Sequence, residues 1–295
     1  MVLTVYSARR VLLSGGLVGA ALLAGCGTLA TEPASAPVPA PARVSGAASA
    51  QLTAADAAIR QTLAPTGKLR AAAYLGSPSS MVIDAKTGEK VGITISLGRE
   101  LARRLDVPFE LVEHRLVADV VASLKSGAAD FTVTNASPAR ARDIDFTQPI
   151  IDLELGYLVL PGAVITSIDA VDRPGMRIGV SQGSSSQGAL TRVYKNASVV
   201  PVTSLKMGAQ WLIEKKLDAF ATNKAVLSQM MDELPGARLL DGRWGVEHIG
   251  IAIPKGRDAA LPYLKQFAAE VQSNGQLAAA VVRAGLRGTA APGVQ

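Results

Sequence analysis

The sequence predicts an α/β protein made of two lobes, and three observations support this fold class. Strand-like apolar runs alternate with helix-like amphipathic runs from residue 68 to residue 284. The order of strands and helices in residues 68–134 recurs in residues 177–222. The chain has 295 residues, of which 48% are hydrophobic, and this is enough for two cores. Alternation of this kind produces parallel sheets covered by helices.

Residues 9–27 contain a candidate export signal. Arg9 and Arg10 precede an apolar run, residues 11–25, that is too short and glycine-rich for a membrane-spanning helix but suits a secretion signal. The run ends in Leu-Ala-Gly-Cys at Cys26, which resembles the lipobox of bacterial lipoproteins. We expect residues 1–25 to be a lipoprotein signal peptide and Cys26 the lipidated residue. The alternative is an unlipidated signal peptide with an incidental cysteine, and the arginine pair fits either a twin-arginine or an ordinary secretion signal.

Residues 26–50 predict a lipid anchor followed by a linker. They are rich in Pro and Ala and have polyproline character, which holds a folded body away from a membrane surface. The sequence therefore predicts an exported protein, periplasmic or at the cell surface, that is lipid-anchored through Cys26.

The composition excludes several classes of function. Removal of Arg9 and Arg10 with the signal lowers the formal net charge from +6 to +4, and no block of Lys and Arg occurs. We therefore expect no nucleic-acid partner. His114 and His248 are the only histidines and no cluster of Cys, His or Glu accompanies them, so we expect no metal and no cofactor.

The first series of elements is expected between residues 51 and 160. Leu97, Leu101 and Leu105 recur every four residues and predict one buried helix face. The expected elements are a helix at 51–64, a strand at 68–75, a helix at 94–105, a strand at 109–113, a helix at 117–125, a strand at 130–134, a short helical turn at 138–143 and a strand at 152–160.

The second series begins after residue 176 and uses the same signals of apolar runs and turn residues. The expected elements are a strand at 177–181, a helix at 185–194, a strand at 198–202, a helix at 205–215, a strand at 218–222, a helix at 224–233, a strand at 244–253 and closing helices at 259–273 and 276–284.

Four segments carry a resemblance to a known family: TISLGRELARRLDVP at 94–108, LKSGAADF at 124–131, SPARARDIDFTQP at 137–149 and GVSQGSS at 179–185. Their order and spacing resemble the extracytoplasmic solute-binding proteins of ABC importers, in the polar amino-acid branch (family 3). The resemblance runs from about residue 68 to residue 286.

The resemblance implies two doubly wound lobes joined by two hinge strands, the type II periplasmic-binding fold. It places lobe 1 in residues 51–160, lobe 2 in residues 161–246, and a return to lobe 1 in residues 247–288, with a tail at 289–295. It also implies a monomer that binds a small polar solute with a carboxylate and delivers it to an ABC permease. Ligands of open α/β sheets bind beyond the carboxyl ends of strands, so the strand-to-helix turns are the expected site.

The first such turn contains Asn135, Ser137 and Arg140. Ser137 fits a helix cap before Pro138. In the resembled family the arginine of this motif clamps the carboxylate of the ligand, and this role carries over to Arg140, whose guanidinium offers two parallel donors. A surface ion pair with Asp143 or Asp145 is the alternative. Asn135 and Ser137 would add hydrogen bonds, or would serve only in capping.

The turn after residue 181 contains Ser185 and Ser186. Backbone amides at a helix start favour an anion, and in the family this loop binds the same carboxylate from the second lobe. Ser185 and Ser186 take those places here, unless the serines only cap the helix.

Two positions depart from the family. Asn223 stands where amino-acid binders usually carry an aspartate for the ammonium of the ligand, and an amide lacks that charge. A solute with an amide, hydroxyl or urea-like group would then fit better, or Asn223 only caps the next helix. Ser77 stands near the usual aromatic position, and Tyr74 is the other candidate to cover the ligand. Trp244 begins a hinge-side strand and is a further cleft candidate.

A binding protein of an importer is the leading hypothesis, and we do not expect an enzyme. A ligand-sensing accessory lipoprotein is one alternative. A cyclohexadienyl-dehydratase-like enzyme on the same fold is another, but it needs a carboxylate general acid in the cleft. The matched loops contain none, and Glu247, beside a hinge, is the nearest candidate.

Overall fold

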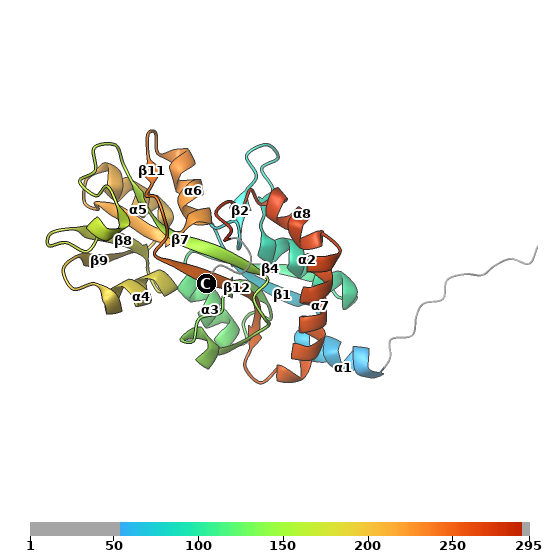
Figure 1. The fold of residues 1–295 in the computed structure, drawn as a ribbon. Coiled ribbons are helices and arrows are strands. Elements are labelled where there is room, and N and C mark those ends of the chain that lie inside the picture. The colour runs from blue at the N-terminus through green and yellow to red at the C-terminus, as the bar shows by residue number, and fades with distance from the viewer. Residues whose placement is uncertain (1–53, 291–295) are drawn as a thin grey trace, which may run out of the picture. The chain divides into compact units, whose positions relative to one another are not determined.

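Two long strands, β7 (Ile151–Val159) and β12 (Gly245–Pro254), run antiparallel through the middle of the protein (Figure 1). The structure is a computed structural model that describes residues 54–290, with side chains from residue 56. The predicted signal, Cys26, the linker and residues 291–295 lie outside the described residues. Gly245 pairs with Leu155 and Ile249 pairs with Ile151, and this ladder fixes which side chains of β12 point inward.

The two strands belong to one eight-stranded sheet with the order β5-β12-β7-β10-β8-β9. Its further members on that path are β5 (Thr132–Asn135), β8 (Arg177–Ser181), β9 (Ser198–Val202) and β10 (Ala219–Asn223). β8 pairs in parallel with β9 and β10, whereas β12 is antiparallel to β5 and β7. β6 (Ile144–Phe146) pairs with β12, and β11 (Arg238–Leu239) pairs with β7.

The elements at one end of this sheet come from the first part of the chain and its return. They surround a parallel pair, β1 (Leu69–Tyr74) and β4 (Phe109–His114) (Figure 1). The others are α1 (Ala54–Leu63), β2 (Val82–Ile83), β3 (Lys90–Val91), α2 (Ile93–Arg104), α3 (Val117–Lys125), η1 (Arg140–Arg142), η3 (Asp258–Ala260), α7 (Leu261–Ser273) and α8 (Gln276–Arg283).

The elements at the other end pack around β8, β9 and β10 (Figure 1). They are η2 (Ile168–Ala170), α4 (Ser185–Val193), α5 (Leu205–Ile213) and α6 (Lys224–Glu233). Ser184 and Ser204 cap α4 and α5, because each hydroxyl accepts a hydrogen bond from the backbone amide three residues later.

The hydrophobic cores divide along β7. Leu153 packs in a core with Leu97, Phe131 and Phe267, whereas Leu158, a few residues later, packs with Phe220 in another. Each lobe therefore has a core of its own, and β7 and β12 pass from one to the other. The lobe limits drawn from the sequence stay a prediction.

The predicted fold class is confirmed, as are its regular elements. The bounds of α3, β9 and α6 are those expected, and Leu97, Leu101 and Leu105 are buried as predicted. The helical turn expected at 138–143 is a single 3₁₀ turn. The expectation of parallel sheets was incomplete, because the strands that leave and re-enter a lobe run in opposite directions. β2, β3, β6 and β11 have two or three residues, too few for a periodic pattern.

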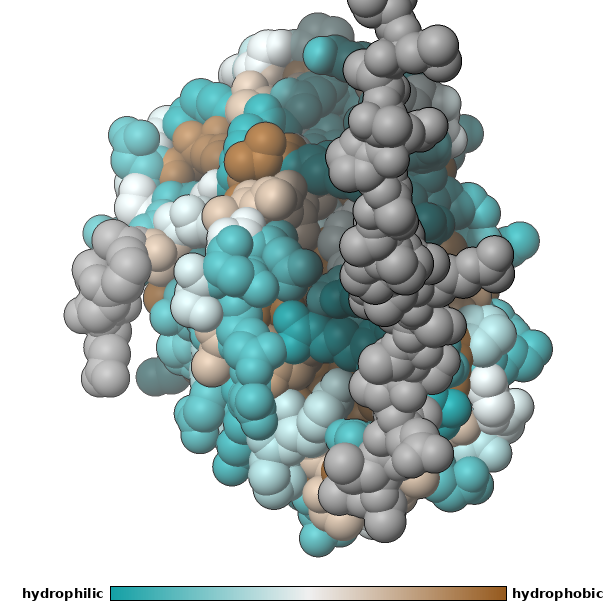
Figure 2. Space-filling model, turned by 90° about the vertical axis from the view of Figure 1, so that its right-hand side faces the viewer, coloured by the Kyte–Doolittle hydropathy of each residue, from teal (hydrophilic) through white to brown (hydrophobic). Residues whose placement is uncertain are grey.

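No helix within residues 54–290 has the length and apolar character needed to cross a membrane. The side of the protein that carries α1, α2, α7 and α8 is mostly hydrophilic where Figure 2 leaves it visible, with small separate hydrophobic areas.

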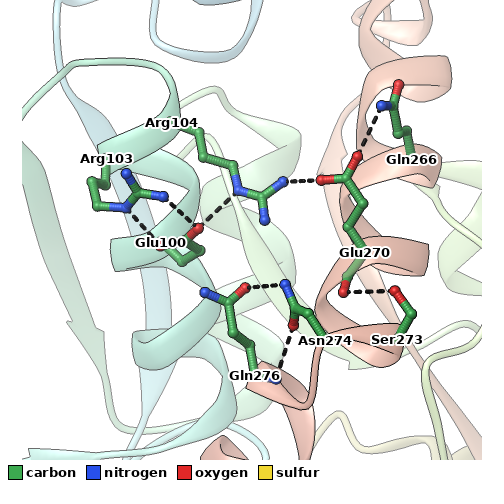
Figure 3. Close-up of polar contacts among 8 residues, drawn as sticks. All are labelled: Glu100, Arg103, Arg104, Gln266, Glu270, Ser273, Asn274 and Gln276. Atoms are coloured by element: carbon green, nitrogen blue, oxygen red, sulfur yellow. Dashed lines mark hydrogen bonds and ion pairs between the residues drawn. The ribbon is translucent and has the colours of Figure 1, made fainter.

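A polar cluster ties α2 to α7 on this side (Figure 3). Glu100 accepts hydrogen bonds from Arg103 and Arg104, and the guanidinium of Arg104 also reaches Glu270 at 2.5 Å. Hydrogen bonds from Arg103 and Arg104 lower the pKa of Glu100 to about 2. A carboxyl with a lowered folded-state pKa adds stability that is fully present above its unfolded pKa. This stability is lost progressively as the pH falls from about 4.5 to about 2.

We therefore expect Glu100→Gln to lose less stability than the wild type when the pH falls from about 6 to about 3. The difference should be about 1 kcal/mol or less, because the cluster is partly open to solvent. Denaturant midpoints at the two pH values measure it. Glu89→Gln, which removes an exposed carboxylate, should behave like the wild type, and equal losses in all three proteins would contradict the prediction.

Candidate functional site

A narrow cavity of about 30 Å³ lies between the lobes, where β5, α4, β10 and β12 meet. A larger surface groove of about 780 Å³ lies away from it between β3, α2 and α8. Polar side chains of both lobes line the narrow cavity. They include Tyr74, Asn135, Arg140, Ser185, Asn223 and Glu247.

Two glycine turns bring the lobes together beside this cavity. Gly76 has φ +101° and packs on Leu205 of α5, and a Cβ there would lie 2.5 Å from the leucine side chain. Gly183 has φ +69° and packs on Ala118 of α3, again with 2.5 Å to an added Cβ. Both backbone angles favour glycine, and both contacts leave no space for a side chain. The structure is therefore closed around the cavity.

Arg140 lies in the cavity with its guanidinium almost fully buried. Its Nη1 donates to Thr134 Oγ1 at 2.7 Å, and within residues 54–290 this is its only side-chain hydrogen bond. Burial lowers the pKa of Arg140, and the charge of Glu247 opposes this shift. The alternative surface pairs with Asp143 and Asp145 do not form, since these bind Lys125 and Lys255.

The residues around Arg140 have separate positions. Asn135 ends β5 at the cavity, and its Nδ2 lies 3.4 Å from Glu247 Oε1. The Ser137 hydroxyl accepts from the backbone amide of Arg140 at 3.4 Å, a contact within the turn before η1, and Ser137 does not line the cavity.

The first turn of α4 approaches from the other lobe. Ser184 caps the helix by accepting from the amide of Gln187 at 3.1 Å. Ser185 lines the cavity, and its Oγ donates to Glu247 Oε1 at 2.5 Å. Ser186 is buried beside the cavity without lining it, and its hydroxyl has no partner within the described part of the chain. The helix start thus offers backbone amides to the cavity.

Asn223 has the capping role considered from the sequence, and it also lines the cavity. Its Oδ1 accepts from the amide of Val226 at 3.0 Å and so caps α6. Its Nδ2 then points at the cavity and donates to Glu247 Oε2 at 2.8 Å. Because the cap fixes the amide, the NH₂ group is held toward the carboxylate.

Glu247 is the residue that the sequence reasoning missed as part of the site. It is 6% exposed and lines the cavity, so the cleft holds a carboxylate that comes from a hinge strand and not from the matched loops. The alternation of residues along β12 could have indicated that the Glu247 side chain points inward. Glu247 has the same parity as Ile249, Ile251 and Ile253, which are all buried, while His248 points outward to Asp152.

Of the remaining candidates, only Tyr74 lines the cavity, whereas Ser77 and Trp244 do not. Tyr74 lines the cavity, and burial raises the pKa of its phenol. Ser77 is fully buried, hydrogen-bonds Ser79 at 2.9 Å and does not line the cavity. Trp244 packs on Tyr157, and its Nε1 donates to the carbonyl of Gly156 at 3.0 Å. It is partly buried against the core of the second lobe and does not line the cavity, so the cleft position considered for it is not the one it takes.

The family model for bacterial extracellular solute-binding proteins, family 3, matches residues 70–283. The chain belongs to this family. A curated relative is the glutamine-binding protein of an ABC transporter from Bacillus subtilis, which is 23% identical over 64% of this chain and 71% of the relative. A probable histidine-binding protein of Neisseria gonorrhoeae is 22% identical over 66% and 74%.

Solved structures share the fold, which is that of type II periplasmic-binding proteins. A putative ABC-transporter binding component from Wolinella succinogenes, complexed with lysine, matches with a TM-score of 0.66 and 24% identity. The match covers 74% of this chain and 95% of that protein. Family members are extracellular by description and are substrate-binding components of ABC transporters.

The contact between Asn223 and Glu247 can be tested through stability. Asn223→Asp keeps an oxygen for the α6 cap but places a second carboxylate beside Glu247. The pair would hold a proton to a higher pH in the folded protein than in the unfolded chain. Its stability is then present at low pH and is lost as the pH rises.

We expect Asn223→Asp to lose about 1–3 kcal/mol between about pH 4 and about pH 8, relative to Asn223→Ser, which caps without a charge. Denaturant midpoints at both pH values measure this loss. The same pH dependence in both variants would show that the two side chains are not neighbours.

Proposed function

We propose that this protein is the solute-binding component of an ABC importer. It captures a small carboxylate-bearing solute between its lobes by hinge closure and delivers it to a membrane permease. The observation that carries the proposal is Arg140. Its buried guanidinium faces a cavity between two lobes, and only one of its five donors is used within the described residues.

A carboxylate in this cavity would receive donors from both lobes. Arg140, on the first lobe, supplies parallel N–H groups, and the start of α4, on the second, supplies backbone amides. A solute that touches both lobes binds the closed form better than the open one and shifts the equilibrium toward closure. The closed form would dock on the permease, and the protein acts as a monomer.

The relatives support an amino acid or a similar molecule as the solute. Relatives are named for binding glutamine and histidine, and a structural neighbour was solved with lysine. The polar lining of the cavity agrees with a small polar solute, with Tyr74 as its aromatic cover.

Glu247 bears on the enzyme alternative, because its carboxyl group lies in the cavity where a general acid would be needed. One structural neighbour is an ancestral amino-acid-binding protein described as a precursor of cyclohexadienyl dehydratase. A general acid must hold a proton to donate. Both oxygens of Glu247 instead accept hydrogen bonds, from two side-chain amides and one hydroxyl, and neither acts as a donor. This supports binding rather than catalysis.

The exported position is proposed from the sequence signal. Cys26 would carry the lipid, and the linker would hold the lobes off the membrane. In a bacterial host we expect Cys26→Ala to move the protein from the membrane fraction to the soluble fraction and to abolish labelling by a radioactive fatty acid. A variant that keeps both properties of the wild type would overturn the lipid anchor.

The carboxylate clamp is tested by binding. The twenty L-amino acids, their carboxamides and their α-hydroxy acids would be screened by thermal shift, since a ligand at about a hundred times its Kd adds about 2.7 kcal/mol. We expect Arg140→Lys to weaken every carboxylate ligand about tenfold or more, because the charge stays but the two-pronged geometry is lost.

Arg142→Lys is the matched control, because Arg142 is exposed two residues away and should leave the affinity unchanged. Titration calorimetry gives the Kd values. If no carboxylate solute binds, or if carboxamides bind equally well, the proposed function is wrong.

A further inference from the structure

Glu247 is a buried carboxylate that has no cationic partner among the residues that the structure describes. Its three hydrogen bonds come from the neutral groups of Asn135, Ser185 and Asn223. Within residues 54–290 neither Glu247 nor Arg140 forms an ion pair. Buried charges are normally paired, because neutral donors only partly replace water. The cavity therefore holds two opposite charges that do not neutralise each other by contact.

The surroundings of Glu247 fix its orientation. Oε1 is shared by groups of both lobes, Asn135 on one and Ser185 on the other. Oε2 accepts a single hydrogen bond, from the amide of Asn223 that the α6 cap holds in place. A carboxylate offers about four lone-pair positions, so acceptor capacity remains on the side of the cavity. Asn223 is thus a positioning residue that aims the carboxylate.

We propose that Glu247 binds a positively charged group of the solute, so that the protein selects zwitterions such as α-amino acids. This inference rests on the proposed function, in which Arg140 holds the carboxylate of the same solute. The ammonium group then lies at Glu247 on β12, and the uncharged Asn223 on β10 does not exclude it. Asn223 considered alone predicts a preference for solutes with an uncharged amide or hydroxyl group. With Glu247 in the site, we expect the opposite preference, for solutes with an ammonium group.

Charge complementarity supports the assignment. Arg140 and Glu247 line one cavity, and the charge of Glu247 acts on both Arg140 and Tyr74. A solute with a carboxylate and an ammonium on neighbouring atoms would satisfy both charges in one closed space, whereas a hydroxy acid would leave Glu247 unpaired. A buried group that the wrong ligand leaves unpaired discriminates strongly between ligands. Such a ligand removes water from that group but forms no hydrogen bond or ion pair with it.

The experiment compares each amino acid that binds with its own α-hydroxy acid, by titration calorimetry on the wild-type protein and on Glu247→Gln. We expect the wild type to prefer the amino acid at least about tenfold. In Glu247→Gln the affinity for the amino acid should fall about ten- to a hundredfold, while that for the hydroxy acid should change less than about threefold.

Asp152→Asn is the matched control, because it removes a carboxylate from the same pair of hinge strands but on the outward side, where Asp152 contacts His248. It should keep the preference of the wild type. Glu247→Asp, which keeps the charge on a shorter side chain, should retain part of the preference. The comparison on the wild type needs no variant, so it holds even if Glu247→Gln does not fold.

The outcomes separate the two proposals. A wild type that binds hydroxy acids as tightly as amino acids, and loses both in Arg140→Lys, would overturn the role of Glu247 and leave the carboxylate clamp standing. An unchanged preference in folded Glu247→Gln would also overturn it. If no amino acid and no hydroxy acid binds, the proposed function and this inference both fail.

Discussion

The antiparallel pairing of β7 with β12 is the constraint on which the rest of the structure depends. β7 leads out of the first lobe and β12 leads back to it. Both strands belong to the one sheet to which the two lobes contribute strands. Because neighbouring side chains on a strand point to opposite faces, the register of the pair turns Glu247 inward and His248 outward. A slip of one residue would remove the carboxylate from the cavity, so the chemistry of the site is set by a backbone ladder.

The burial of charges in the cavity is unfavourable for the stability of the protein without a ligand. It buries Arg140 and Glu247 between the lobes with neutral hydrogen-bond partners, although buried charges usually require close opposite charges. Elsewhere the chain follows that rule, as Asp130 shows by pairing with both Arg70 and Arg257 at 2.8 Å. Two charges in one closed space that form no ion pair within residues 54–290 are consistent with a site that a ligand completes.

Asn223 illustrates why one residue cannot be interpreted alone. By itself an amide at the end of β10 argues against a cationic ligand group, and it also fits a plain helix cap. In the structure the cap to Val226 and the hydrogen bond to Glu247 use opposite ends of the same amide. The negative charge of the site comes from Glu247 on β12, more than twenty positions along the chain. The amide at position 223, where relatives usually have an aspartate, therefore does not by itself exclude a cationic ligand group.

The sequence by itself determined the two-lobed α/β fold, the main helices and strands, and the position of Arg140. These follow from local signals, namely apolar periodicity in α2, serine caps before α4 and α5, and a motif that joins β5 to η1. The tertiary structure alone decided the antiparallel hinge pairing, the short strands, the burial of Ser77, the packing of Trp244 on Tyr157, and the place of Glu247. Such features depend on contacts between distant segments, and strands of two residues contain no period to detect. A charged residue in a hinge strand becomes a candidate for ligand binding only when its neighbours in space are known.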